Sequence, residues 1–258
     1  MTSFFILIIN RLIKLTGALV KLISYIFHYI FPNKRFIIPL QSDPFIKSNT
    51  QYKIPKIIWQ TNYSNKVSLP VYCNYLFNRI VSPDWEYRYM GHEDRDEFMK
   101  ANAPAEVYES FKKLTDGAAQ ADLWRIFTLN FYGGVYMDFD AYAILPLSFM
   151  IKPDDTEVFL LNKQHYTNYF IAAAKGNAVL EKTLNLIVSN IKQKKIDGGV
   201  YELTGPTVLN NAIGDTPVNY RYYKYTCNQG GFTNEYFQYI DKPRGKWTHA
   251  KKEDLLKD

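Results

Sequence analysis

A helix that ends at two glycines and leads directly into an apolar strand constrains this chain more than any other feature. Thr115 or Asp116 is a suitable N-cap for a helix through the apolar run that follows. Gly133 and Gly134 then stop that helix, because glycine adopts left-handed backbone angles at no steric cost. The residues from Val135 to Leu145 have the apolar, β-branched and aromatic character of a strand. This order of elements predicts a layered α/β domain.

Short apolar runs and helical patterns alternate along most of the chain, without an internal repeat or a low-complexity linker. We therefore expect one folded domain over residues 36–258, preceded by a separate N-terminal segment over residues 1–35. The other expected elements are strands at 56–59, 158–161 and 170–174 and a helix at 178–192.

Two aspartates, Asp138 and Asp140, lie within the expected strand. In an extended strand, residues i and i+2 point to the same side, roughly 6.5 to 7 Å apart at Cα. Paired carboxylates suit Mg²⁺ or Mn²⁺, which prefer hard oxygen ligands and keep open positions for diphosphate oxygens. The alternative is a strand end that carries two exposed aspartates without function.

Asp122 and Arg125 are three residues apart and therefore share one face of the expected helix. A carboxylate acceptor beside a guanidinium donor is a suitable pair for sugar hydroxyls. The alternative is an ion pair on a solvated surface, which contributes only about 0.3–0.5 kcal/mol. The helix ends at the glycine pair that precedes Asp138 and Asp140, which predicts that both pairs reach one pocket.

Four stretches of the sequence resemble glycosyltransferase family 32, the sugar-binding region containing a DXD motif. The stretches are PKIIWQT, PDWEYRYMGHED, ADLWRIFTLNFYGGVYMDFDAYAIL and TGP, and they cover roughly residues 54–210. Members of this type build capsular polysaccharide and lipopolysaccharide, and the clostridial glucosylating toxins are more distantly similar. The resemblance implies a Rossmann-like GT-A fold, a nucleotide-sugar donor, a divalent metal (Mn²⁺, or Mg²⁺) and retention of anomeric configuration.

The resemblance also implies roles for individual residues around the donor. Trp59 would stack on the nucleotide base, and Tyr136 would line the donor pocket. Asp122 and Arg125 would hold sugar hydroxyls, and Asn168 would lie near the donor sugar.

The metal and acceptor sites follow from the same resemblance. Asp140 would ligate the metal, and Asp138 would contact both the metal and the donor. Thr204-Gly205-Pro206 matches a loop near the acceptor cleft. Family members place a His and a Ser-Trp pair near the C-terminus, where this chain has Trp247-Thr248-His249. His249 is therefore a candidate metal ligand, and an exposed histidine in the tail is the alternative.

The positive charge of the chain lies mainly in its first 42 residues. The formal net charge is +6, and five cations without a single acid precede Asp43. The remainder of the chain is nearly neutral, which argues against a nucleic-acid partner.

The N-terminal segment predicts an amphipathic helix, because its polar residues from Ser3 to His28 fall in one narrow stripe at about 100° per residue. A wide apolar face with a thin cationic stripe is typical of a helix that lies on an anionic membrane. Its uncharged stretches fall short of the roughly 18 to 20 residues of a spanning helix. We therefore expect a monotopic anchor on the cytoplasmic side. A core-packing terminal helix and a tilted spanning helix are the alternatives.

These observations together predict a metal-dependent, retaining glycosyltransferase. It would move a hexose from UDP-hexose, the favoured donor, to a hydroxyl of a lipid-linked or cell-surface glycan. GDP-mannose is the second candidate donor. The rival functions are a catalytically silent glycan- or nucleotide-sugar-binding scaffold, a metal-dependent phosphoesterase and a toxin-like transferase acting on a protein.

Overall fold

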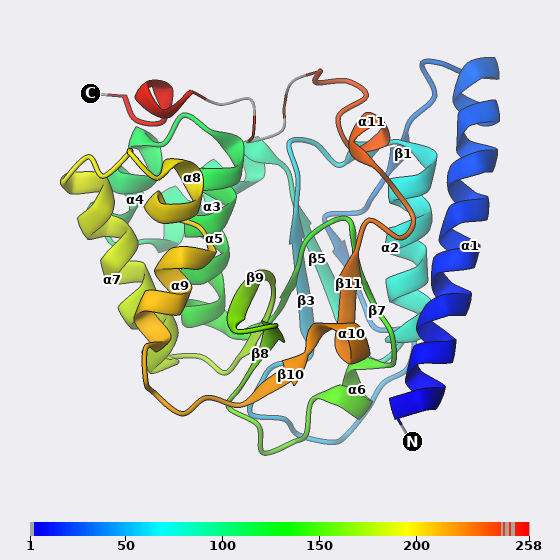
Figure 1. The fold of residues 1–258 in the computed structure, drawn as a ribbon, viewed down its shortest axis with the longest axis horizontal. Coiled ribbons are helices and arrows are strands. Elements are labelled where there is room, and N and C mark those ends of the chain that lie inside the picture. Colours follow the sequence, from blue (N-terminus) through cyan, green and yellow to red (C-terminus); the bar gives the residue numbers. More distant parts are fainter. Residues whose placement is uncertain (1–2, 244, 246–247, 249–250, 258) are drawn as a thin grey trace.

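A mixed seven-stranded sheet forms the centre of the protein (Figure 1), which a computed structural model describes over residues 3–243, 245, 248 and 251–257. The strand order in this sheet is β10-β8-β9-β6-β3-β5-β2. The strands β3, β5 and β6 run parallel to one another, whereas β9 is antiparallel to both of its neighbours. The predicted α/β class is therefore confirmed.

The strands are short, and two further pairs, β1–β4 and β7–β11, lie outside the central sheet. In chain order the strands are β1 (Phe36–Ile37), β2 (Gln41–Ser42), β3 (Ile57–Thr61), β4 (Lys66–Val67), β5 (Glu86–Met90), β6 (Gly134–Met137), β7 (Ala141–Ala143), β8 (Glu157–Asn162), β9 (His165–Ala173), β10 (Tyr220–Tyr222) and β11 (Cys227–Gln229).

The helices range from single turns to the long N-terminal helix α1. In chain order they are α1 (Ser3–Ile30), α2 (Leu69–Val81), α3 (His92–Asn102), α4 (Ala105–Lys113), α5 (Gly117–Tyr132), α6 (Leu147–Met150), α7 (Ala178–Lys192), α8 (Gly199–Leu203), α9 (Pro206–Ile213), α10 (Tyr223–Thr226), α11 (Glu235–Gln238) and the 3-10 helix η2 (Lys252–Asp254).

Helices cover both faces of the sheet (Figure 1). Adjacent residues of β3 point to opposite faces, so Trp59 joins the apolar cluster beneath α5 and α7 while Ile58 joins the cluster beneath α2. Because both faces of the sheet are covered, β6 is buried at every position, whereas β5, nearer the edge, alternates between buried tyrosines and partly exposed, mainly charged residues.

The predicted turn between α5 and β6 is present. The Asp116 carboxylate accepts hydrogen bonds from the backbone N–H groups of Ala118 and Ala119, so Asp116 is the N-cap. Gly133 (φ 73°) and Gly134 (φ 113°) both have left-handed backbone angles. A Cβ on Gly133 would also lie 2.7 Å from Pro55 Cδ. Both the angles and the close packing therefore require glycine at this turn.

The prediction of one continuous strand over 135–145 is wrong, because the observed strand is interrupted at Asp138 and Asp140. β6 ends at Met137, and the Ala141 N–H donates to the Asp138 carbonyl at 2.8 Å, which closes a four-residue turn. The chain then leaves the central sheet, and β7 pairs with β11 instead. Asp138 and Asp140 therefore project from a turn at the carboxyl end of β6, not from the side of a strand.

The remaining predicted elements are present. The helix expected over 178–192 is α7, and the strand expected at 56–59 is β3, which extends to Thr61. The strands expected at 158–161 and 170–174 are parts of β8 and β9, which form a hairpin.

α1 packs against α2 and α10 at the side of the domain (Figure 1). Its buried positions are Asn10, Ile13, Gly17, Ser24 and His28, so the polar stripe faces the protein. The apolar side chains of α1 face outward and are exposed, for example Phe4 (67%), Leu15 (69%) and Leu22 (61%). A core-packing helix would bury these side chains, which removes that alternative.

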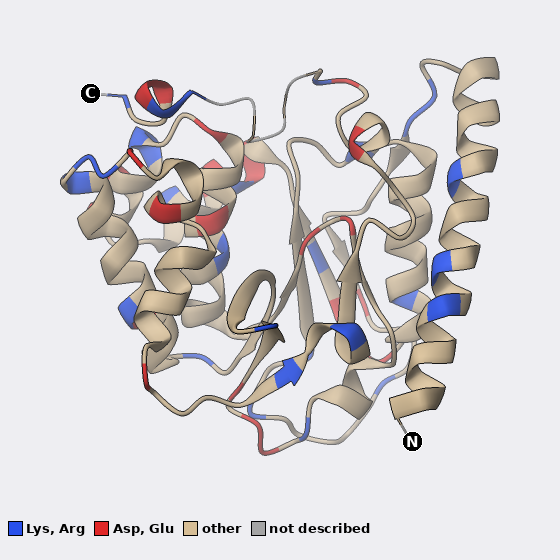
Figure 2. Cartoon of the chain, in the orientation of Figure 1, with Lys and Arg blue, Asp and Glu red and all other residues tan. Residues whose placement is uncertain are grey.

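By length and composition α1 is able to cross a membrane, with a mean hydropathy of 1.7 over its most apolar window. The charged residues on α1 are all cations (Figure 2).

Candidate active site

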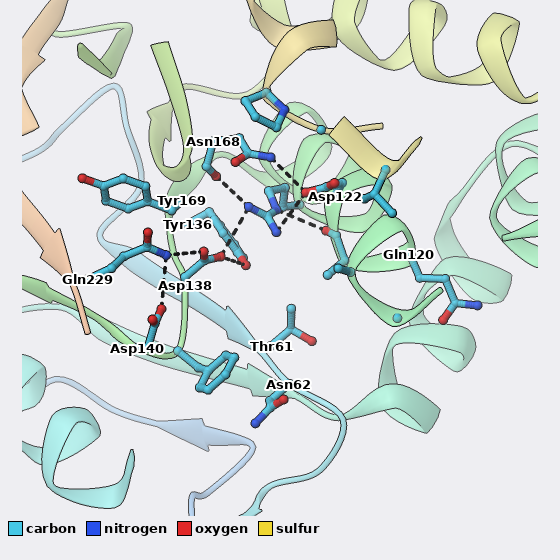
Figure 3. Close-up of a pocket in the computed structure, with 18 of the residues that line it drawn as sticks. Thr61, Asn62, Gln120, Asp122, Tyr136, Asp138, Asp140, Asn168, Tyr169 and Gln229 are labelled. Atoms are coloured by element: carbon cyan, nitrogen blue, oxygen red, sulfur yellow. Dashed lines mark hydrogen bonds and ion pairs between the residues drawn. The ribbon is translucent and has the colours of Figure 1, made fainter. Parts of the chain in front are cut away.

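A cavity of about 920 Å³ opens where the parallel strands β3, β5 and β6 end (Figure 3). In α/β sheets, ligands bind in the crevice outside the carboxyl ends of such strands. The segments that line the cavity are 61–63, 92–95, 115–125, 136–140, 162–169, 200–206 and 229–245.

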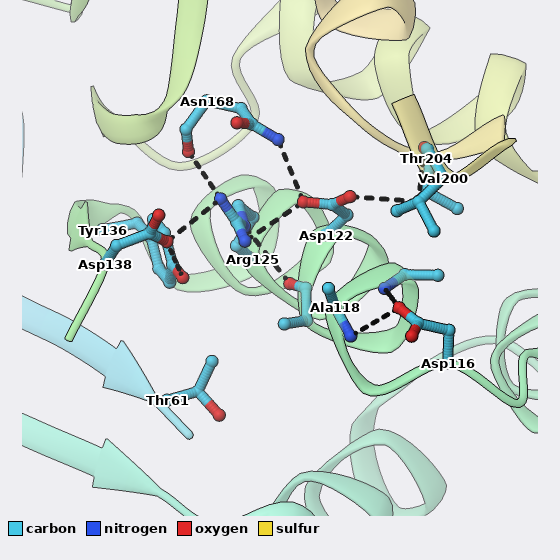
Figure 4. A network of polar contacts seen from close by, with 12 residues as sticks. Thr61, Asp116, Ala118, Asp122, Arg125, Tyr136, Asp138, Asn168, Val200 and Thr204 are labelled. Atoms are coloured by element: carbon cyan, nitrogen blue, oxygen red, sulfur yellow. Dashed lines mark hydrogen bonds and ion pairs between the residues drawn. The ribbon is translucent and has the colours of Figure 1, made fainter. Parts of the chain in front are cut away.

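Asp122 and Arg125 lie on the α5 face that borders the cavity, and both are buried. The two side chains form an ion pair, with Arg125 Nη2 at 3.1 Å from Asp122 Oδ1. Asn168 Nδ2 donates to Asp122 Oδ1 at 2.9 Å, and Thr204 Oγ1 donates to Asp122 Oδ2 at 3.0 Å. Three side chains from α5, β9 and the α8–α9 turn thus hold one carboxylate in place (Figure 4).

Arg125 connects this carboxylate to the aspartate turn. Its Nη1 donates to the Asn168 carbonyl at 2.7 Å and lies 3.3 Å from Asp138 Oδ1. The guanidinium also lies over the Tyr136 ring, 4.2 Å from the centroid. The Tyr136 hydroxyl in turn donates to Asp138 Oδ1 at 2.6 Å. The exposed ion pair that the sequence left as an alternative is therefore excluded, because this pair is buried within a network.

Two glutamine amides hold Asp140, and one of them also bridges to Asp138. Gln229 Nε2 donates to Asp138 Oδ2 at 2.7 Å and to Asp140 Oδ1 at 3.2 Å. Gln238 Nε2 donates to Asp140 Oδ2 at 3.1 Å. The Gln229 amide N–H group lies between two carboxylates, at a position that would also suit a cation (Figure 3).

Burial shifts the pKa values of two carboxyl groups in the site, those of Asp140 and Asp122. Desolvation by burial and then the charge of Asp138 raise the pKa of Asp140 to about 7. Desolvation likewise raises the pKa of Asp122 to about 6, although Arg125 opposes the shift. Desolvation alone would lower the pKa of Arg125, but Tyr136, Asp122 and Asp138 outweigh it and raise that pKa. Perturbed acids gathered in one cavity are typical of a functional site.

The donor set at the aspartate turn fits a divalent metal of the Mn²⁺ or Mg²⁺ type. Two carboxylates converge on one amide nitrogen, and each glutamine also carries an amide oxygen that could serve as a ligand. Within the described part of the chain, no group of three or more His, Cys, Asp or Glu side chains could hold a metal ion. His249, the predicted third ligand, lies outside the described residues.

The structure brings most of the predicted donor residues together. Tyr136 and Asn168 line the cavity beside Asp122 and Arg125. Gly205 and Pro206 line its other side, and the neighbouring Thr204 contacts Asp122 directly, so the TGP turn belongs to the same site.

Trp59 does not lie in the cavity, which corrects its predicted stacking role. Its side chain is fully buried, and its indole N–H donates to the Gly133 carbonyl at 3.0 Å. Aromatic neighbours such as Phe98 and Trp124 enclose the ring. No face of the indole remains for a base, so Trp59 is a core residue. The cavity is instead lined by Thr61, the last residue of β3, and by Asn62 and Tyr63, which follow the strand.

Sequence reasoning missed Arg95, Gln229 and Gln238. Arg95 is buried at the cavity wall and donates to Thr61 Oγ1 at 2.8 Å, and none of the described carboxylates forms an ion pair with it. The segment HEDRDE has the composition of a solvated helical turn, so this inward arginine had no distinguishing signal. The glutamines lie about ninety residues from the aspartates in sequence, and no local pattern relates them.

Comparison with known proteins supports a glycosyltransferase of GT-A-like fold, a class to which a carboxylate-lined cavity at the strand ends of a mixed α/β sheet is suited. The family described as "Glycosyltransferase sugar-binding region containing DXD motif" matches residues 70–176. Residues 70–176 thus resemble the DXD-containing sugar-binding region of glycosyltransferases, and this match supports a transferase activity for the protein. The matched residues include Asp122, Arg125, Asp138, Asp140 and Asn168.

One of the similar solved structures supports the same class of fold. The "PaToxG Glycosyltransferase" superposes with a TM-score of 0.52 at 19% identity, over 63% of this chain and 69% of that one. The UDP-bound glycosyltransferase domain from the YGT toxin gives a TM-score of 0.40 at 11% identity, over 57% of this chain and 54% of that one. A comparison with curated proteins found no match.

Proposed function

We propose that the protein transfers a hexose from a nucleotide diphosphate sugar, with UDP-hexose as the first candidate, to a hydroxyl of a lipid-linked or cell-surface glycan. The observation that carries this proposal is the continuous network from Asp122 through Arg125 to Asp138, which ends beside Asp140 in one cavity. The network would thereby hold the sugar-binding pair, Asp122 and Arg125, at a fixed distance from the metal-binding pair, Asp138 and Asp140.

Asp122 and Arg125 would orient the donor sugar by accepting from and donating to its hydroxyls. Both groups are already fixed by Asn168 and Thr204, so little conformational entropy would be lost when a sugar binds. The Arg125 guanidinium is fully ionised at any working pH and can donate to ring and hydroxyl oxygens alike.

Asp138 and Asp140 would hold the divalent cation. When bound, that cation would neutralise the charge that develops on the departing nucleoside diphosphate. The protein's own contribution would be positioning and preorganised charge, since a retaining reaction of this kind needs no enzyme nucleophile. The proton of the acceptor hydroxyl would pass to an oxygen of the leaving diphosphate on the same face of the sugar.

The acceptor side of the proposal is supported by α1. A helix that exposes an apolar face and carries only cations suits the cytoplasmic surface of an anionic membrane, where lipid-linked glycans are presented. Such a location would make the protein an enzyme of capsular polysaccharide or lipopolysaccharide synthesis. A silent binding scaffold would use the same cavity, so binding and turnover must be measured separately.

Thermal unfolding in the presence of nucleotide sugars tests the donor. A ligand that binds only the folded state at 100 times its dissociation constant adds about 2.7 kcal/mol, which raises Tm by several degrees. We expect UDP-hexoses with Mn²⁺ to give the largest rise in Tm and the same sugars with a chelator to give little. GDP-mannose is the matched comparison for the base. If no nucleotide sugar raised Tm with or without metal, the proposed donor class would be wrong.

A further inference from the structure

The segment that carries both glutamines, residues 229–238, lies between the aspartate turn and α1; we call it the glutamine segment. Gln229 and Gln238 contact the aspartates at its two ends. The Gly230 N–H donates to the Asp140 carbonyl at 3.1 Å, so backbone and side chains both attach this segment to the site.

The opposite side of the glutamine segment rests on the polar stripe of α1. A Cβ built on Gly17 would lie 2.7 Å from the Gly231 carbonyl carbon, so the two backbones touch and only glycine fits. Lys21 Nζ donates to the Gly230 carbonyl at 3.2 Å. Gly230 itself has φ 68°, a conformation that a side chain would disfavour.

The far end of the glutamine segment contacts the C-terminal half of α1. Asn234 Nδ2 donates to the Tyr25 hydroxyl at 2.8 Å. The Phe237 ring lies 4.6 Å from that of Tyr25 and 5.8 Å from that of His28. α1 thus supports both ends of the segment that holds Asp140.

The outer face of α1 points away from all of these contacts. It is apolar and exposed over the full length of the helix, and the exposed cations Arg11 and Lys14 border it. An anionic lipid surface matches such a face in both hydrophobicity and charge. Since the apolar face is outside and the polar stripe is inside, lipid contact and domain contact do not compete for the same residues.

We infer that α1 positions the glutamine segment at Asp138 and Asp140 through its inner face while its outer face lies on an anionic membrane. The lipid half of this inference rests on the proposed membrane location, whereas the positioning half does not. The inference includes a linkage: the membrane binds α1 more tightly when its inner face is docked, so membrane binding and order in the glutamine segment increase together.

Hydrogen exchange of the full-length protein tests the positioning half without metal or donor. In Gly17→Leu the new side chain must displace the backbone at Gly231, so we expect the amides of residues 229–238 to exchange at least about tenfold faster. Ala18→Leu is the matched control, because it adds a similar side chain at the next, exposed position of the same helix. Gly17→Leu should also weaken Mn²⁺ binding, measured from the signal of free Mn²⁺, while sedimentation with vesicles is retained.

A milder pair of variants covers the case in which Gly17→Leu does not fold. Lys21→Met removes the bond to the Gly230 carbonyl, and Lys14→Met makes the same charge change at an exposed position. Faster exchange at residues 229–238 in Lys21→Met than in Lys14→Met supports the inference. If every variant that folds exchanges these amides at the same rate as its control, the inference is overturned.

The lipid half is tested with wild-type protein and two kinds of vesicle. Phosphatidylcholine vesicles that contain phosphatidylglycerol should slow exchange in residues 229–238, and vesicles of phosphatidylcholine alone should do so less. Unchanged or faster exchange on the anionic vesicles overturns the linkage. A protein that showed these exchange effects but transferred no sugar would contradict the proposed function and leave the positioning role intact.

Discussion

Asp140→Asn is expected to lower glycosyl transfer at least about 100-fold while the protein stays folded. The substitution keeps the size of the side chain and removes the charge that a divalent cation requires. It replaces one of the two acceptor oxygens with an NH2 donor, to which a glutamine can present its amide oxygen by rotating its own amide group. It also removes the charge whose burial, together with repulsion from Asp138, raises the pKa of Asp140. We therefore expect the variant to unfold at the same temperature as wild type or at a higher one, a combination typical of a functional site under electrostatic strain.

Asp154→Asn is the matched control, because the Asp154 side chain is 97% exposed and makes only a distant ion pair with Lys53. It makes the same chemical change away from the cavity and should leave both transfer and Tm unchanged. Full metal-dependent transfer by Asp140→Asn would contradict the assignment of the metal site.

Among the substitutions proposed here, Arg125→Met is expected to lower the free energy of unfolding most. The guanidinium is buried between Asp122 and Asp138, and its removal leaves two carboxylates without their common counter-ion. Breaking a buried pair by removing one partner costs about 3–5 kcal/mol of unfolding free energy. Denaturant unfolding should show this loss, and the residual folded protein should no longer bind a nucleotide sugar.

A double-mutant cycle separates the charge effect from lost packing. Asp122→Asn combined with Arg125→Met should cost less unfolding free energy than the sum of the single changes, since Asp122→Asn removes a carboxylate that Arg125→Met leaves unpaired. Lys112→Met provides the surface comparison, because Lys112 pairs with Asp96 in a largely exposed position and should cost at most about 1 kcal/mol. Strict additivity of the two buried changes would show that the network does not act as a unit.

The parts of the fold that the sequence predicted well are those with local signals. The N-cap at Asp116 and the glycines at 133 and 134 set the limits of α5, and each acts through its immediate neighbours. The shared face of Asp122 and Arg125 likewise follows from helical geometry alone. Long-range packing was not needed to predict either feature.

The errors have a common physical origin in contacts between distant segments. Trp59 lies in a strand that is buried on both faces, and its environment is set by helices α3 and α5 rather than by its neighbours in sequence. The strand through Asp138 and Asp140 is interrupted because residues 141–143 pair with β11, which lies more than eighty residues later. The helical periodicity of the sequence predicted the polar stripe of α1. That this stripe faces the domain depends on the close approach of Gly17 to Gly231, which no local pattern indicates.

The central claim is metal-dependent glycosyl transfer at the Asp138–Asp140 turn, and release of nucleoside diphosphate from the donor tests it most directly. Full-length protein is incubated with the nucleotide sugar that raises Tm most, with Mn²⁺ or with a chelator, and the free diphosphate is quantified by ion-exchange chromatography. The account predicts release by wild type that requires Mn²⁺ and falls to background in Asp140→Asn. Saturable donor binding without any release, in the presence of lipid-linked glycan acceptors, would contradict it and identify a binding scaffold instead.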